Sequence, residues 1–153
     1  MLDPIDEKIL RVLEKDARVS FNELAEQVGL SKTPSWARVR ELERQKIITA
    51  YRAEIDPARV GLGLHAFVQV TISATKAGEF EQAIVHHHSV LECYTTAGQG
   101  DYLLHILVPG IEALDTLLRE EISRMSGVER LVTTVGMKTI KGRGLVMECA
   151  KGP

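Results

Sequence analysis

Basic side chains gather in one short segment of a chain that is acidic elsewhere. Residues 30–52 carry six Lys or Arg against two Glu, a net charge of +4, whereas the whole 153-residue chain has a net charge of −2. Guanidinium groups such as those of Arg40 and Arg44 can hydrogen-bond phosphate oxygens or the O6 and N7 edge of guanine. The segment therefore predicts contact with double-stranded DNA, with a solvated helix face as the alternative.

The residues before this segment predict two helices. Asp3 and Pro4 have the types that begin a helix, as an N-cap and a first helical residue. Ser20 and Glu23 fit a capping box at the start of a second helix, and Gly29 ends it after about two turns. A short helix followed by a glycine turn and a basic helix is the layout of a helix-turn-helix.

The basic helix is predicted to begin near Ser31 or Thr33. Trp36, Val39 and Leu42 recur at helical spacing, so we expect them to form its buried stripe. The opposite face would then lie in the major groove of DNA. The predicted DNA contacts are Ser31, Lys32, Thr33, Ser35, Ala37, Arg38, Arg40 and Arg44.

Other reactive side chains lack the spacing that catalysis or metal binding needs. Cys93 and Cys149 stand apart and are expected to be free thiols, and the consecutive residues His86–His88 point to different sides of a helix. His65 and His105 stand singly in predicted strands, and an enzyme built around them is the competing hypothesis. We predict no catalytic residue, no metal and no cofactor.

The second half of the chain changes to strand periodicity. In residues 64–73, Ala66, Val68 and Val70 alternate with more polar residues. Helices are expected at 80–84 and 111–125, and strands at 90–97, 102–108 and 131–140. This β-α-β-β-α-β order predicts an α+β, ferredoxin-like domain with two helices on one face of an antiparallel sheet. The other face, which includes Phe67, would be uncovered in a monomer, so we expect at least a dimer.

These patterns divide the chain into three parts. Residues 1–49 are the predicted helix-turn-helix domain, 50–62 a short strand and linker, and 63–153 the ferredoxin-like domain. The sequence has neither a long apolar run nor a signal peptide, which predicts a cytoplasmic protein that does not enter a membrane.

Many short motifs resemble the leucine-responsive regulatory protein and asparagine-synthetase regulator (Lrp/AsnC) family. The matching residues are Leu2-Asp3, Ile5-Asp6, Ile9-Leu10, Asp16-Ala17-Arg18, Leu24-Ala25, Val28-Gly29-Leu30-Ser31, Thr33-Pro34, Arg38-Val39, Leu42-Glu43, Ile48, Gly98 and Gly100-Asp101-Tyr102-Leu103-Leu104, with the final strand. The resemblance implies a transcription regulator with a winged or simple helix-turn-helix and a ligand-sensing domain. It also implies dimers that commonly assemble in fours.

The resemblance further implies an amino-acid effector bound between dimers. Carried over to this chain, its site comprises Gly98, Gly100, Asp101, Tyr102, Thr133, Thr134 and Val135. Backbone donors and hydroxyls could hold a carboxylate, and Asp101 could accept hydrogen bonds from an ammonium group. A tight hairpin would need the two glycines in any case. An effector-insensitive regulator or an architectural DNA-binding protein is the other interpretation. The sequence departs from the family at Lys32, Ser35 and Gly136, and the departure at Gly136 bears on effector identity.

Overall fold

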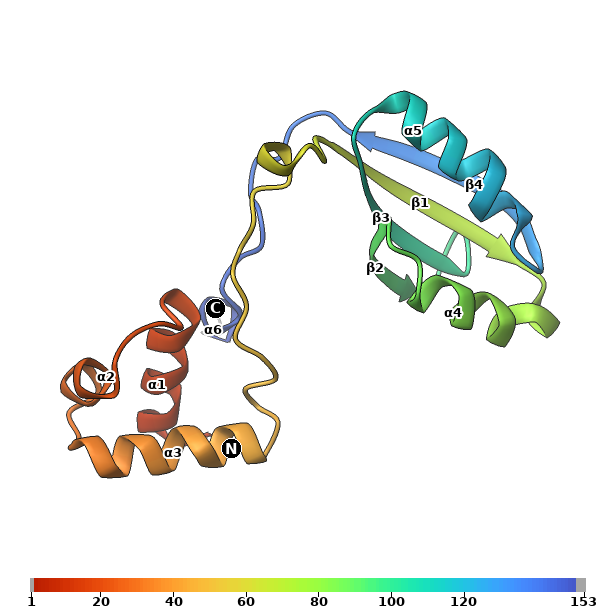
Figure 1. Ribbon diagram of the computed structural model, residues 1–153. Coiled ribbons are helices and arrows are strands. Elements are labelled where there is room, and N and C mark those ends of the chain that lie inside the picture. The colour runs from red at the N-terminus through yellow and green to blue at the C-terminus, as the bar shows by residue number, and fades with distance from the viewer. Residues whose placement is uncertain (1, 151–153) are drawn as a thin grey trace. The chain divides into compact units, whose positions relative to one another are not determined.

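The computed structural model describes residues 2–150, which form two compact units (Figure 1). The first unit comprises residues 2–54 together with 141–150, and the second comprises 55–140. The predicted C-terminal domain, 63–153, was therefore too long, because residues 141–150 pack with the N-terminal unit. Residues 1 and 151–153 lie outside the described residues.

The first unit is built on three helices, α1 (Pro4–Lys15), α2 (Phe21–Val28) and α3 (Lys32–Arg44). Asp3 caps α1 by accepting hydrogen bonds from two backbone N–H groups, and Ser20 and Glu23 form the predicted capping box of α2. The helices bury a common apolar core of Ile9, Leu24, Val28, Val39 and Leu42.

A short C-terminal helix, α6 (Val146–Cys149), packs against α1. The Glu14 carboxylate accepts hydrogen bonds from the backbone N–H groups of Val146 and Met147 at 2.5 and 2.9 Å. Arg11 donates to the Met147 carbonyl at 2.6 Å. These bonds satisfy backbone groups in the first two residues of a helix too short to be stable alone, and they explain why the tail joins the first unit.

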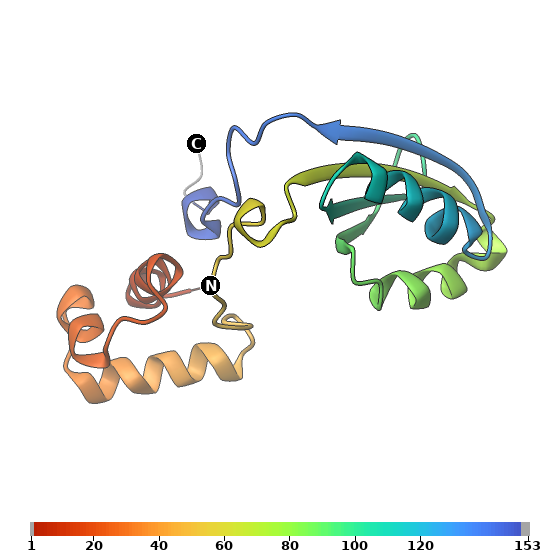
Figure 2. The same ribbon diagram turned by 45° about the horizontal axis from the view of Figure 1, so that its top comes forward.

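The second unit is a four-stranded antiparallel sheet with strand order β2-β3-β1-β4. Its strands are β1 (Leu64–Ile72), β2 (Val90–Thr95), β3 (Tyr102–Val108) and β4 (Val128–Gly136). Helix α4 (Ala77–Val85) follows β1, and α5 (Ile111–Thr116) follows β3 and continues as a π-helical and a 3-10 segment to Arg124. Both helices lie on the same face of the sheet (Figure 2). The predicted ferredoxin-like α+β order is confirmed.

The two faces of the sheet differ as the alternation predicted. Ala66, Val68 and Val70 are fully buried and pack with residues of both helices. On the opposite face, which we call the open face, Phe67 is 40% exposed. Tyr94 and Val132 are also exposed, and the strand register places them on the same face as Phe67.

The prediction of a short strand between residues 50 and 62 is wrong, because the structure has no strand there. Residues 49–56 have no regular secondary structure, and Ala58–Val60 form a 3-10 turn. An extended segment becomes a strand only when another strand pairs with its N–H and C=O groups, and none does so among residues 2–150. Within the same residues, no helix is long and apolar enough to cross a lipid bilayer.

Candidate nucleic-acid interface and effector loop

Helices α2 and α3 are joined by a turn that the sequence dictates. Gly29 adopts φ +76°, the left-handed conformation that lets α2 end abruptly, and Ser31 is the extended N-cap of α3. The Ser31 side chain makes no capping hydrogen bond. The turn thus presents the first residues of α3, including the Ser31 hydroxyl, at one end of the unit.

The buried face of α3 differs from the predicted one. Ser35, Val39 and Leu42 are 0, 2 and 3% exposed, whereas Trp36 is 48% exposed. The assignment of Trp36 to the buried stripe was wrong: a stripe at i, i+4, i+7 follows the 3.6-residue turn more closely than one at i, i+3, i+6. Ser35 is also removed from the predicted DNA contacts, because its buried hydroxyl donates to the Ser31 carbonyl at 3.0 Å.

Apart from Pro34, the exposed residues of α3 form one mostly polar face, which we call the outer face of α3. It consists of Lys32, Thr33, Trp36, Ala37, Arg40 and Arg44. The guanidinium carbon of Arg40 lies 5.3 Å from the centroid of the Trp36 ring. Trp36 is the residue that sequence reasoning missed, although its i, i+4 spacing to Arg40 is the spacing that brings two helical side chains together.

Arg38 has partners inside the unit. Its Nη1 atom donates to the Asp6 carboxylate at 2.8 Å and also to the Asp3 carboxylate, so it joins α3 to α1. These hydrogen bonds raise the pKa of Arg38. The pKa of Asp3 is lowered, first by the N–H of Asp6 and then by Arg38. Arg38 therefore positions α3 as well as being a candidate for DNA contact.

The other two arginines of α3, Arg40 and Arg44, differ in whether they form an ion pair. Arg44 donates to Glu41 from Nε at 2.7 Å and from Nη2 at 2.5 Å. These bonds and one from Gln45 lower the pKa of Glu41 to about 2, so it is charged at neutral pH. Neither Arg40 nor Lys32 forms an ion pair with any residue of the described part of the chain. Arg40 thus places a positive charge without an ion-pair partner among the described residues near the middle of the outer face.

The predicted effector loop is a tight connection between β2 and β3. Gly98 and Gly100 have φ of +150° and +110°, and the Thr96 hydroxyl donates to the Gly100 carbonyl at 2.9 Å. Oδ2 of Asp101 accepts a hydrogen bond from the Ile72 N–H at 2.8 Å. One oxygen of the proposed ammonium acceptor is therefore already used to hold the loop against β1.

The side chain of Tyr102, a residue of the predicted effector site, points into the core of the second unit. It is 5% exposed, its ring packs against Phe80, and its hydroxyl donates to Glu81 at 2.7 Å. That hydrogen bond and burial raise the pKa of Tyr102 to about 12. The side chain belongs to the core between β3 and α4, because alternation along β3 turns it toward the helices.

The three predicted residues of β4 lie on two faces. Thr134 pairs with Phe67 on the open face, whereas Thr133 pairs with Val68 and Val135 packs against the core. Strand β1 runs between β4 and the Gly98–Asp101 loop, since it pairs with β3 on one side and β4 on the other. Within one subunit, β1 therefore separates the Gly98–Asp101 loop from the predicted effector residues of β4.

Two histidines without an assigned partner in the sequence meet on the open face. The β1–β3 register brings His65 Nδ1 within 3.0 Å of His105 Nε2, and Glu92 lies 3.5 Å from the other nitrogen of His105. Among residues 2–150, no group of three His, Cys, Asp or Glu side chains could hold a metal ion. Cys93 and Cys149 are exposed free thiols, as predicted.

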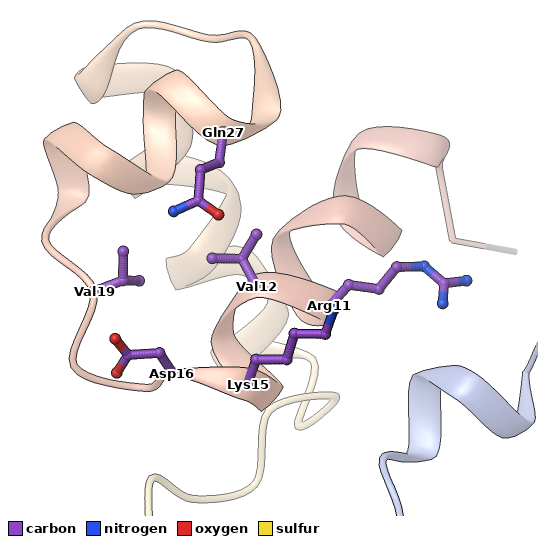
Figure 3. A pocket seen from close by; sticks show the side chains of 6 residues that line it. All are labelled: Arg11, Val12, Lys15, Asp16, Val19 and Gln27. Carbon is purple, nitrogen blue, oxygen red and sulfur yellow. The ribbon is translucent and has the colours of Figure 1, made fainter.

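A pocket in the first unit lies between the end of α1 and α2 (Figure 3). It is lined by Arg11, Val12, Lys15, Asp16, Val19 and Gln27. Arg11 extends from this pocket toward α6, where it bonds Met147 and lies 3.8 Å from Glu148 (Figure 3). Arg11, one of the two cationic residues that line the pocket, is therefore engaged by the C-terminal helix.

Comparison with known proteins covers both units. A family model described as winged helix-turn-helix DNA-binding matches residues 2–49, and one described as the Lrp/AsnC ligand binding domain matches residues 65–146. The leucine-responsive regulatory proteins of Escherichia coli K12 and Salmonella typhimurium are each 41% identical over 143 residues, covering 92% of this chain and 87% of theirs.

Solved structures of transcription regulators are similar to this chain over nearly its whole length. A Neisseria meningitidis transcriptional regulator in complex with L-Met has a TM-score of 0.91 and 31% identity, over 95% of this chain and 96% of that chain. The leucine response regulatory protein of Mycobacterium tuberculosis has a TM-score of 0.81 and 33% identity, over 94% and 99%.

Proposed function

The chain belongs to the Lrp/AsnC family of transcription regulators, and from that membership we propose that α3 reads DNA while the α+β unit senses a free amino acid. It is a regulator and not an enzyme. The observation that carries the DNA-binding proposal is the outer face of α3, where cationic and small side chains are exposed together on one helix.

The residues of this face are assigned distinct contacts. Lys32, Thr33 and the Ser31 hydroxyl lie at the start of α3, where side chains reach the phosphate backbone. Ala37 is small and allows close approach, and Arg40 and Arg44 can reach base edges or phosphates. Arg38 acts mainly by holding α3 on α1, a role that its bonds to Asp3 and Asp6 support.

We further propose that two copies pair through the open face of the sheet. Phe67, Tyr94 and Val132 would be removed from water by a second copy of the same face. The resulting dimer would read two half-sites roughly one helical turn, or 34 Å, apart. From the resemblance to the family, we further propose that four such dimers assemble together.

The effector site is proposed to be shared between copies. The glycine loop and β4 lie on opposite sides of β1 in one sheet, so a ligand touching both needs a neighbouring subunit. An α-carboxylate would be held by loop N–H groups or Thr133, and Oδ1 of Asp101 could accept from the ammonium. The L-Met complex of the Neisseria regulator supports an amino acid as the ligand class. No cofactor is required, and we place the protein in the cytoplasm with the DNA it regulates.

The test is fluorescence anisotropy of a labelled duplex taken from upstream of this protein's gene, at two salt concentrations, with and without pooled amino acids. Binding that weakens steeply with salt and prefers this duplex over a scrambled one supports DNA recognition. A 5- to 150-fold shift of affinity by the pool corresponds to a typical coupling of about 1–3 kcal/mol. Equal affinity for both duplexes would refute the recognition role of α3, and an unchanged affinity with every amino acid would leave an effector-insensitive regulator.

A further inference from the structure

The outer face of α3 contains one large aromatic side chain, and its exposure has a local cause. Trp36 is 48% exposed because Ser35, not Trp36, fills the contact between α3 and the other helices. Nothing in the core of the first unit uses the indole ring. Its polar neighbour is Arg40, whose guanidinium carbon lies 5.3 Å from the ring centroid.

This pair combines an apolar surface with a cation. A guanidinium above an indole face is attracted by the ring quadrupole, and its planar group packs against the flat ring. Both side chains therefore lose conformational freedom. Ala37, beside them on the same face, contributes only a methyl group and leaves the indole to project further. The result is a preformed apolar edge next to a positive charge, on a helix proposed to enter the major groove.

The major groove offers one apolar group that such an edge fits. Of the four bases, thymine alone presents a methyl group there, at C5, and side-chain carbon atoms recognise it by direct contact. Cytosine lacks this group and presents an amino group beside the same position. An indole ring buries the thymine methyl group, whereas cytosine offers it no methyl group to bury.

We propose that Trp36, held in place by Arg40, contacts the C5-methyl group of a thymine and thereby selects that base in each half-site. The inference rests on the proposed function, because it requires α3 to lie in the major groove. It assigns Trp36 as a specificity-determining residue and Arg40 as its positioning partner, in addition to any contact that Arg40 makes itself.

The experiment begins with duplexes that the full-length protein selects from a random library. Each thymine of the selected site is then replaced singly by deoxyuridine, which removes the methyl group and keeps the pairing and the hydrogen-bonding edge. At one position in each half-site we expect the affinity of the wild-type protein to fall about fourfold, the effect of exposing one methyl-sized group. With Trp36→Ala, the same replacement should change affinity by less than about 1.5-fold, because the contact is already absent.

Two control variants make the assignment specific. Tyr51→Ala removes another aromatic residue that is 48% exposed in the same unit but lies outside α3, and it should keep the full thymine effect. Thr33→Ser removes the γ-methyl group of another exposed residue of the outer face and should also keep the full thymine effect. Thermal unfolding of each variant shows that the unit is folded.

The outcomes separate this inference from the proposed function. If selection yields a preferred duplex but no thymine is sensitive to deoxyuridine, or if sensitivity survives in Trp36→Ala, the role of Trp36 is overturned and DNA recognition stands. Loss of sensitivity in Thr33→Ser alone would assign the methyl contact to Thr33 and overturn the proposal. If no duplex is preferred at all, the proposed function fails, and the Trp36 contact with it.

Discussion

Arg38 in α3 donates a hydrogen bond to Asp6 in α1 at 2.8 Å, and the same nitrogen also donates to Asp3. The N-cap of the first helix is therefore connected to the helix proposed to read DNA. Because the ion pair between Asp3 and Arg38 needs an ionised Asp3, whose pKa is lowered in the folded protein, the contact between α1 and α3 is expected to weaken in acid.

The first prediction concerns acid stability. The pKa of Asp3 is lowered in the folded protein by the N–H of Asp6 and by Arg38, so folding favours its ionised form. That stabilisation is complete above the unfolded-state pKa of about 3.9 and is lost as pH falls through the lower folded-state pKa. Asp3→Asn keeps an N-cap residue but removes the charge. It should be less stable than wild type at pH 7 and converge with it below the folded-state pKa.

The measurement is urea unfolding between pH 2 and 7, followed by the fluorescence of Trp36, the single tryptophan of the chain. Because Trp36 lies in the first unit, its signal reports the unit that contains Asp3. A difference in the free energy of unfolding that stays constant over the whole pH range would show that the Asp3 charge is not the cause.

A second prediction tests the burial of Ser35. Ser35→Leu should destabilise the first unit by about 1–3 kcal/mol, because a larger side chain must enter a closed helix contact. Ser35→Ala should fold normally and keep wild-type DNA affinity, since the hydroxyl bonds only the Ser31 carbonyl among residues 2–150. Urea unfolding and anisotropy on the same samples check both. A folded Ser35→Ala variant with tenfold weaker DNA binding would restore Ser35 as a DNA contact.

These residues show which features the sequence could predict. The N-cap at Asp3, the Ser20–Glu23 capping box and the turn at Gly29 depend on a few neighbouring residues, and the structure confirms all of them. The alternation around Val68 was likewise local. The choice between Ser35 and Trp36 for the buried position was not, because it depends on how closely another helix approaches.

Long-range contacts account for the remaining differences. His65 and His105 meet only through the register of two strands, which no single-strand pattern specifies. The packing of α6 on α1 depends on Glu14 and Arg11, more than 130 residues earlier in the chain. The segment 50–62 has strand-like composition but lacks the pairing partner that a strand requires.

The third prediction concerns charge on the outer face. Glu41 is ionised and bound to Arg44, so it repels phosphates and competes with them for the guanidinium. Glu41→Gln should tighten DNA binding and make the slope of log affinity against log salt steeper by about one per subunit, as Arg44 gains a phosphate contact. Arg40→Ala should make the slope shallower by a similar amount. Anisotropy at five salt concentrations measures both, and an unchanged slope in Glu41→Gln would place Arg44 away from DNA.

A fourth prediction compares two glycines of the second unit. Gly100 has φ +110°, and a Cβ there would lie 3.4 Å from the Val70 carbonyl oxygen, so Gly100→Ala should cost about 1–3 kcal/mol. Gly78 lies in α4 with open space around it, and Gly78→Ala should stabilise by about 0.4–1 kcal/mol. Amide hydrogen exchange of β1 and β3 reads out both changes. Equal effects of the two substitutions would mean that the loop conformation at Gly100 is relaxed in solution.

The last prediction tests the open face of the sheet as the dimer interface. Phe67 is 40% exposed and stacks on His105, with a centroid distance of 4.7 Å. A glutamate at position 67 leaves the helix-covered core intact but places a charge in the proposed interface. Two-fold symmetry puts the change on both subunits, so Phe67→Glu should weaken dimerisation by roughly 100-fold, the loss of two partly buried aromatic contacts.

Ile111→Glu is the matched control, because Ile111 is 61% exposed at the start of α5, on the helix-covered side. Sedimentation velocity over a concentration series should then show monomers for Phe67→Glu and dimers or larger assemblies for wild type and Ile111→Glu. Dimers of Phe67→Glu at the wild-type dissociation constant would exclude the open face as the dimer interface.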